Sequence, residues 1–159
     1  MYALRHQHVH NNTDLPLAGI YYSWDEALER SYDYAIVTNP SSLHYATALK
    51  LAEKGIPFIL EKPAVTSLEG IEVLTQTVHE RQVPVLVGFN LRYHYLYETM
   101  KHCITDGMIG KPLAFSVETG QYLPDWRPVS YASTYSAQAA LGGGVIFDLT
   151  HELDCVLDV

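Results

Sequence analysis

The segment of this sequence with the most chemistry is GGGVIFDLTHELD, residues 142–154, where a histidine lies among carboxylates after three glycines. Asp148 and His151 are three residues apart, so a helix would place their side chains on one face. There the carboxylate can orient the imidazole and raise the histidine pKa by favouring the charged ring. Because histidine exchanges protons near neutral pH, the segment predicts a general acid or base. A histidine satisfied inside the core is the alternative, and a metal site is not favoured because no second histidine lies at ligand spacing.

Two further segments carry candidate groups directly after apolar runs. In Glu61-Lys62-Pro63 the proline disfavours helix at Lys62 and can hold the Lys-Pro bond cis, which would direct the lysine side chain. In TNPSSLH, residues 38–44, a serine can cap the following helix, whose free N–H groups favour an anion such as a phosphate. Taken alone, each segment is more typical of an ordinary strand end or strand–turn–helix link.

The loop QYLPDWRP, residues 121–128, places aromatic rings beside a guanidinium. Such a set suits a sugar, a carboxylate or the face of a nicotinamide ring. A packed loop anchored by its tryptophan is the alternative. His6, His8 and His10 alternate along the chain, and a polar loop is the preferred interpretation of that stretch.

The elements that must position these groups alternate along the first half of the chain. Continuous apolar runs predict strands, and amphipathic segments between them predict helices; the expected strands are 2–6, 32–40, 56–63 and 83–90, and the expected helices are 23–30, 41–55 and 67–82, with Ser23 and Ser67 as N-caps. This alternation indicates an α/β fold with a parallel sheet covered on both faces. Ligands of such sheets bind beyond the carboxyl ends of the strands, where TNP, EKP and GFN would meet.

The pattern changes near residue 92. A helix over 93–110, a long strand over 111–123 and a helix over about 144–158 are expected after that point. We therefore predict two domains, 1–92 and 93–159.

Composition excludes several classes of function. The net charge is −8 and no cluster of Lys and Arg stands out, so neither nucleic acid nor a membrane surface is an expected partner. The apolar runs are far shorter than a membrane span. Two separated cysteines suggest reduced thiols in a cytoplasmic protein.

The four segments TNPSSLH, EKP, VGFNLRY and GGGVIFDLTHELD, in this order, resemble the Gfo/Idh/MocA family of glucose–fructose oxidoreductase and inositol 2-dehydrogenase. The resemblance covers roughly residues 2–158. The resemblance implies NAD(P)-dependent oxidation or reduction of a sugar or cyclitol hydroxyl, and a homo-oligomer. It implies a partial Rossmann-like, dinucleotide-binding domain over 1–92 and the beginning of an α+β substrate-binding domain over 93–159. The GQYLPDWRP loop resembles members from surface-polysaccharide and nonulosonic-sugar pathways.

The same resemblance assigns roles to residues. Lys62 would touch the substrate hydroxyl and His151 would act as general acid or base, with Asp148 as its acidic partner, although many members place that acid four residues before the histidine. The residues implied for the cofactor are Arg5, Thr38, Asn39, Pro40, His44, Glu61, Lys62, Pro63 and Asn90. Arg5 would suit a 2′-phosphate, so NADP is preferred over NAD. The residues implied for the substrate are Arg92, Tyr122, Trp126 and Arg127, and no metal is implied. The glycines would let the last helix lie against the coenzyme.

The dinucleotide fingerprint G-x-G-x-x-G of the family is not found in this sequence. We therefore expect a family member truncated at both ends, whose isolated chain binds NAD(P) weakly and has no useful turnover. A non-catalytic interaction or regulatory protein on a decayed dehydrogenase scaffold is the alternative, as is a sugar-binding domain without redox chemistry. The geometry that matters most is whether Lys62 and His151 converge.

Overall fold

The computed structural model describes residues 1–5, 16–126 and 128–159, and it divides into two compact units, 1–33 and 34–159. The domain boundary expected near residue 92 falls inside the second unit and stays a prediction. Within the described ranges, no helix has the length and apolar character needed to cross a membrane.

In its described residues, the first unit is a small parallel strand pair followed by a short helix. β1 (Tyr2–Leu4) pairs with β2 (Gly19–Tyr21), and α1 (Trp24–Leu28) follows. The Ser23 hydroxyl accepts a hydrogen bond from the Glu26 N–H at 3.3 Å, so the predicted N-cap is confirmed. The strand β2 was not predicted, because three residues are too few to show a periodic pattern.

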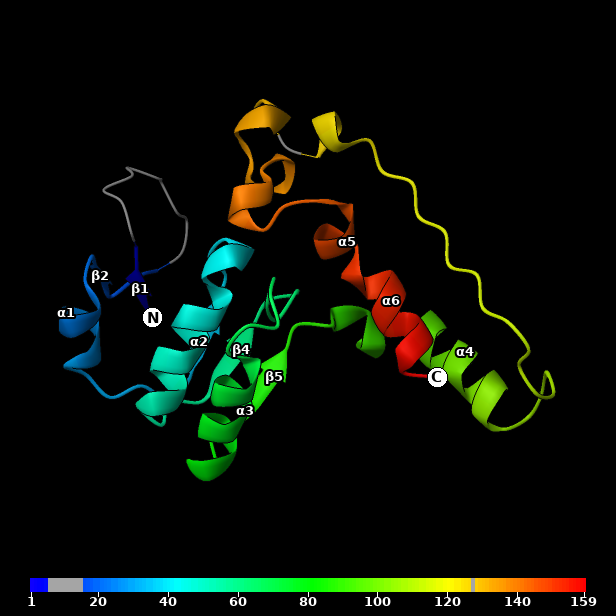
Figure 1. The fold of residues 1–159 in the computed structure, drawn as a ribbon, viewed down its shortest axis with the longest axis horizontal. Helices are drawn as coiled ribbons and strands as arrows, with labels where there is room; N and C mark the ends of the chain where they lie inside the picture. Colours follow the sequence, from blue (N-terminus) through cyan, green and yellow to red (C-terminus); the bar gives the residue numbers. More distant parts are fainter. Residues whose placement is uncertain (6–15, 127) are drawn as a thin grey trace. The chain divides into compact units, whose positions relative to one another are not determined.

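The second unit contains a three-stranded parallel sheet in the order β3-β4-β5, formed by β3 (Ala35–Val37), β4 (Phe58–Leu60) and β5 (Val85–Val87). The crossovers run through α2 (His44–Glu53) and α3 (Ile71–Glu80) (Figure 1). The α/β fold with a Rossmann-like parallel sheet is therefore confirmed.

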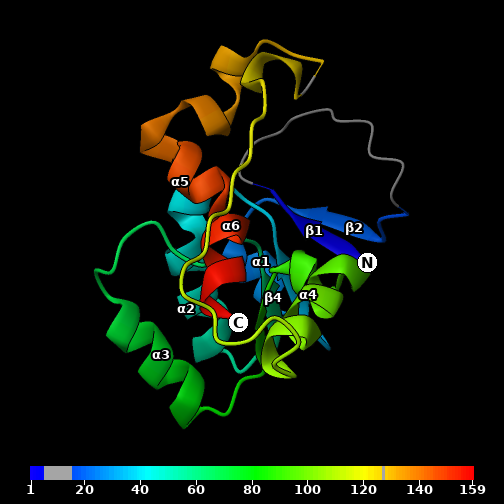
Figure 2. The same ribbon diagram turned by 90° about the vertical axis from the view of Figure 1, so that its right-hand side faces the viewer.

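The core lies on one face of this sheet. Val37, Phe58 and Leu60 are at most 4% exposed, and Ala48 and Ala52 of α2 are fully buried. Figure 2 shows α2 and α3 on the same side of β4, in agreement with the contacts between the two helices. On the other face Ile36 and Leu86 are 54% and 47% exposed, so within the described residues of the second unit the predicted cover is found on one face only.

α3 begins later than expected. The Ser67 hydroxyl accepts from the Glu69 N–H at 3.1 Å and so closes a local turn, and the helix starts only after Gly70, whose φ is +76°. The predicted N-cap at Ser67 is therefore wrong.

The part of the chain after β5 is made of short elements, shown in green to red in Figure 1. They are η2 (Asn90–Tyr93), α4 (Tyr95–Thr105), η3 (Leu123–Asp125), η4 (Tyr131–Ser133), η5 (Tyr135–Ala137), η6 (Ala139–Leu141), α5 (Val145–Asp148) and α6 (Thr150–Leu157). Residues 111–122 form no strand in the described structure, so the predicted strand is wrong there. The predicted last helix is two helices, because the chain turns at Leu149, with φ −109° and ψ 37°.

Candidate active site

A buried histidine joins the loops that follow β3 and β4. His44 is 1% exposed, and its Nδ1 lies 2.7 Å from the Pro63 carbonyl oxygen while its Nε2 lies 3.0 Å from the Asn39 carbonyl oxygen. The neutral ring has one N–H and can donate to one of these oxygens at a time. Because the ring is buried, any role in cofactor binding acts through the two loops rather than by contact, and that role stays a prediction.

Lys62 extends from the loop after β4 to the junction of α5 and α6. Its Nζ donates to the backbone oxygen of Asp148, which lies 86 residues further along the chain. The peptide bond between Lys62 and Pro63 is cis, as the sequence allowed. The ammonium group also acts electrostatically on His151. The structure thus brings Lys62 and His151 together from two distant segments.

Asp148 does not orient His151. Its carboxylate is buried and accepts from the Ser136 hydroxyl at 3.3 Å, and the break at Leu149 interrupts the helix between Asp148 and His151. Burial and then the charge of Lys62 lower the pKa of His151, and these two effects outweigh its neighbouring carboxylates. The expectation that Asp148 raises this pKa is therefore wrong, and the surroundings of His151 favour the neutral imidazole.

The imidazole of His151 packs against an aromatic ring at the end of β5. The Phe89 and His151 ring centroids are 6.0 Å apart and the rings meet edge to face at 79°. Nδ1 of His151 is buried, and it has no hydrogen-bond partner among the described residues. An imidazole held by packing, with a ring nitrogen free, can accept or donate a proton.

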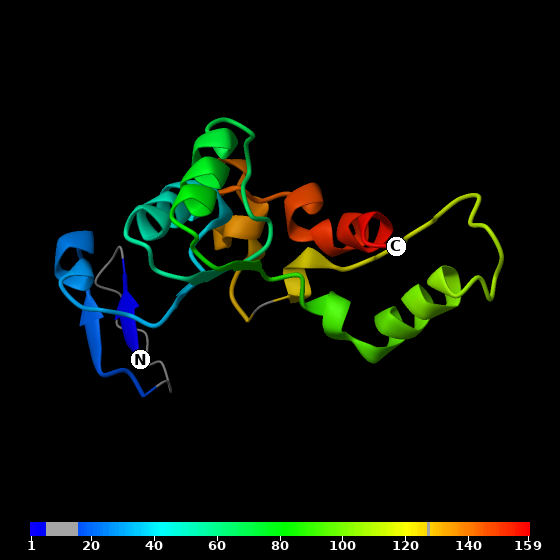
Figure 3. The same cartoon turned by 90° about the horizontal axis from the view of Figure 1, so that it is seen from below.

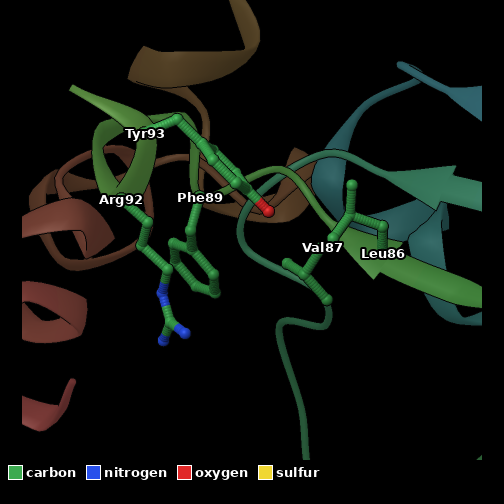
Figure 4. Close-up of a pocket in the computed structure, with 5 residues that line it drawn as sticks. All are labelled: Leu86, Val87, Phe89, Arg92 and Tyr93. Atoms are coloured by element: carbon green, nitrogen blue, oxygen red, sulfur yellow. The ribbon is translucent and has the colours of Figure 1, made fainter.

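A shallow cavity lies beside this aromatic contact. It has a volume of about 290 Å³ and is lined by Leu86, Val87, Phe89, Arg92 and Tyr93. Figure 4 shows the Phe89 and Arg92 side chains extending side by side from one turn, with Tyr93 in a different direction. The guanidinium carbon of Arg92 is 5.6 Å from the centre of the Phe89 ring.

Two of the three glycines before α5 are explained by contacts within the protein. A Cβ on Gly142 would lie 2.8 Å from the Ser42 nitrogen, and Gly142 has φ +82°; a Cβ on Gly143 would lie 2.1 Å from the Tyr135 carbonyl oxygen. The chain at 142–143 therefore approaches the start of η1 and the turn η5 more closely than any side chain allows. The predicted approach to a coenzyme is not needed to account for these two glycines.

Comparison with known proteins adds the family. Residues 2–89 match the sequence profile of the Gfo/Idh/MocA family, which is described as an oxidoreductase family with an NAD-binding Rossmann fold. The chain belongs to the Gfo/Idh/MocA family. The resemblance carried by TNPSSLH, EKP and the strands before them is thereby confirmed.

The relatives of this Gfo/Idh/MocA chain include enzymes of sugars and cyclitols. A 2,7-anhydro-N-acetylneuraminate hydratase of Mediterraneibacter gnavus is 30% identical over 76% of this chain and 31% of its own length. The NADP(+) scyllo-inositol 2-dehydrogenase IolW of Bacillus subtilis is 27% identical over 91% of this chain and 39% of its own length. The structure of the oxidoreductase YvaA of Bacillus subtilis superposes with a TM-score of 0.71 at 26% identity, over 91% of this chain and 40% of that one. The chain thus spans about a third of the length of the curated relatives.

The other residues predicted for the cofactor lie in several places. Asn39 Nδ2 donates to the Thr47 hydroxyl at 2.9 Å, and its buried Oδ1 has no partner in the described part of the chain. Four of the remaining residues lie around the carboxyl ends of the strands: Thr38, Glu61 and Asn90 are exposed and Pro40 is half-buried. Arg5 belongs to the first unit, where its backbone N–H donates to the Tyr21 oxygen at 2.9 Å.

Among the described residues, no hydrogen bond, ion pair or ring contact joins the residues predicted for the substrate to one another. Tyr122 and Trp126 flank η3 and are 70% and 36% exposed. Arg127 lies outside the described residues. Their roles in substrate binding stay predictions.

The structure adds residues that the sequence analysis did not select. Phe89, Ser136 and Asp158 contact the predicted site residues from other segments, and no spacing rule links them to their partners. Asp154 could have been found, because it lies three residues after His151 on one helix face. In the ranges that the structure describes, no group of three or more His, Cys, Asp or Glu side chains could hold a metal ion.

Proposed function

We propose that the protein catalyses NAD(P)-dependent hydride transfer between nicotinamide and a hydroxyl group of a sugar or cyclitol. The observation that carries this proposal is the convergence of Lys62 and His151, which come from segments 86 or more residues apart, at the carboxyl end of β4. In parallel α/β sheets this edge is where ligands bind.

The residues present fit a polar cofactor at this edge. Asn39 Oδ1 and His151 Nδ1 are buried without partners among the described residues, which suits a site that is completed by a polar ligand. The backbone of Gly88 passes close to the Glu61 carboxylate, where a Cβ would lie 3.4 Å from Oε2. When bound, nicotinamide supplies the acceptor or donor of the hydride at its C4 atom.

The side chains of this chain then handle the proton. In the oxidation direction the C–H hydrogen of the alcohol leaves as hydride, and the O–H proton moves to the neutral imidazole of His151, which leaves a carbonyl group. The Lys62 ammonium stabilises the negative charge that develops on the oxygen. The lowered pKa of His151 makes the ring a ready proton acceptor at neutral pH.

The names of the relatives support the substrate class. One relative acts on an inositol and another on an anhydro form of N-acetylneuraminate, a nine-carbon sugar acid. A nonulosonic or surface-polysaccharide sugar is the narrower proposal. NADP is proposed in preference to NAD because an arginine at the position of Arg5 suits a 2′-phosphate. The relatives include scyllo-inositol 2-dehydrogenases named for NADP(+) and for NAD(+). We also propose that the protein forms a homo-oligomer and is located in the cytoplasm.

Steady-state kinetics of the whole protein tests this function. Formation of NADPH or NADH is followed at 340 nm with a panel of cyclitols, hexoses and nonulosonic acids. Lys62→Met and His151→Asn should each lower kcat/KM by about 10²–10⁴-fold, the usual contribution of a positioned acid or base. Lys54→Met and His79→Asn are matched controls, because both side chains are exposed and lie on other elements.

Two results would overturn the proposal. One is a wild-type protein that binds NAD(P)H but oxidises and reduces no member of the panel. The other is wild-type turnover in both Lys62→Met and His151→Asn, which would remove these two residues from the reaction.

A further inference from the structure

The guanidinium of Arg92 pairs with two carboxylates, those of Asp154 in α6 and of Asp158, the C-cap residue of that helix. Its Nε donates to Asp154 Oδ2 at 2.8 Å and its Nη2 to Asp154 Oδ1 at 2.5 Å, and its Nη1 lies 2.8 Å from Asp158 Oδ1. The Asp154 side chain is 7% exposed, so this two-pronged pair neutralises a buried charge. The family resemblance implies a substrate contact for Arg92, but most of its donors are already directed at Asp154 and Asp158.

A second element holds the same helix. Asp158 Oδ2 accepts from the Tyr97 hydroxyl at 3.0 Å and from Lys101 Nζ at 2.7 Å, and both donors belong to α4. Figure 3 shows α6, in red, close to the turn η2 and the start of α4. The carboxyl-terminal half of α6 is therefore tied to both elements that follow β5.

Arg92 also contacts the aromatic ring that packs against His151. The guanidinium lies over the face of Phe89, and the same ring meets the imidazole of His151 edge to face. Asp154 is three residues after His151, on the same face of α6. Arg92 thus contacts both the helix that carries His151 and the ring that packs against it.

We propose that Arg92 is a positioning residue, which holds His151 against Phe89 and toward Lys62 through the paired hydrogen bonds to Asp154. The proposal rests on the proposed function for the catalytic use of His151, but the position itself is measurable without activity. Lysine at this site would keep the charge and lose the two-pronged geometry, because its ammonium is a point charge on a flexible stem.

The protonation of His151 reports its position. The charged groups acting on the ring are Lys62 and Glu61 from the loop after β4, with Glu152 and Asp154 on α6. Neither Arg92→Lys nor Asp158→Asn changes any of these four charges. Because burial is the largest cause of the lowered pKa, a ring that moves out of its place should titrate at higher pH.

NMR titration of the His151 ring in the chain tests the position. Arg92→Lys and Asp158→Asn should raise the His151 pKa toward that of an exposed histidine. Arg81→Lys, an exposed arginine at the end of α3, should leave it unchanged. An unchanged His151 pKa in either folded variant overturns the proposal. Loss of folding in both variants also overturns it, because the network would then serve the fold as a whole.

Kinetics of the whole protein separates positioning from substrate binding. Arg92→Lys should lower kcat about tenfold or more while the substrate KM changes by less than about threefold, since the loss falls on the transition state. A raised KM with an unchanged kcat would instead assign Arg92 to the substrate. If the wild type has no dehydrogenase activity, the proposed function fails while the NMR result still decides the positional claim.

Discussion

A methyl group added at Gly143 should disrupt the packing that holds the α5–α6 junction. The Cβ of an alanine there would lie 2.1 Å from the Tyr135 carbonyl oxygen and 2.6 Å from the Ser136 carbonyl oxygen. Comfortable contacts begin near about 3.5 Å, so one of the two backbone segments must move by more than about 1 Å. That movement would also break the hydrogen bond from Ser136 to the buried Asp148 carboxylate.

The expected loss of stability in Gly143→Ala follows from these two effects. Overpacking of this kind costs about 1–3 kcal/mol. A buried polar group left without its partner costs about 1–3 kcal/mol more. We expect Gly143→Ala to lower the free energy of unfolding by about 3 kcal/mol. With a urea dependence of about 2 kcal/mol per M, the unfolding midpoint falls by about 1.5 M.

Urea unfolding of the chain, followed by far-ultraviolet circular dichroism, measures this shift. Gly120→Ala is the matched control, because a Cβ at Gly120 meets no atom within 4 Å. Its midpoint should stay the same or rise slightly, since alanine reduces the freedom of the unfolded chain. A Gly143→Ala midpoint within about 0.3 M of the wild type would refute the close approach of residue 143 to the turn η5.

The remaining predictions concern charge. Lys62→Met removes a cation that lowers the His151 pKa, so this pKa should rise in an NMR titration. The control Lys54→Met should leave the His151 pKa unchanged. An unchanged His151 pKa in Lys62→Met would contradict the electrostatic effect of Lys62. Hydrogen bonds from Lys101 and then Tyr97 lower the pKa of Asp158, so the carboxylate adds stability that is fully present above its ordinary pKa of 3.8 and is lost as the pH falls through the lowered value. Asp158→Asn should therefore lower the melting temperature at pH 7, and this decrease should become smaller as the pH falls below 3.8. An equal decrease in melting temperature at pH 7 and below pH 3.8 would rule out the contribution of the Asp158 carboxylate to stability.

The regular part of the fold was predictable because its signals are local. The apolar runs that became β3, β4 and β5 are bounded by turn residues, and their alternation with helices fixes a parallel order. The cap at Ser23 also depends on residues only three apart.

The contacts that complete the site could not be predicted, because they join segments with no periodic relation. Arg92 and Asp154 are separated by 62 residues, and Lys62 and the Asp148 carbonyl by 86. The break at Leu149 has a similar cause, since no glycine or proline interrupts the sequence there. The alternating pattern of 111–123 predicted a strand, but in the described structure that segment has no neighbouring strand to pair with.

The hydrogen-bond partner of the Asp148 carboxylate bears on which protonation state of His151 is favoured. A carboxylate hydrogen-bonded to the ring would favour the imidazolium and make His151 a donor at neutral pH. In the structure that carboxylate turns to Ser136, and Lys62 places a positive charge near the ring instead. The imidazole is therefore kept neutral and ready to accept a proton. Under the proposed function, alcohol oxidation should proceed at neutral pH with His151 as base. Carbonyl reduction, which needs the protonated ring, should then be favoured as the pH falls.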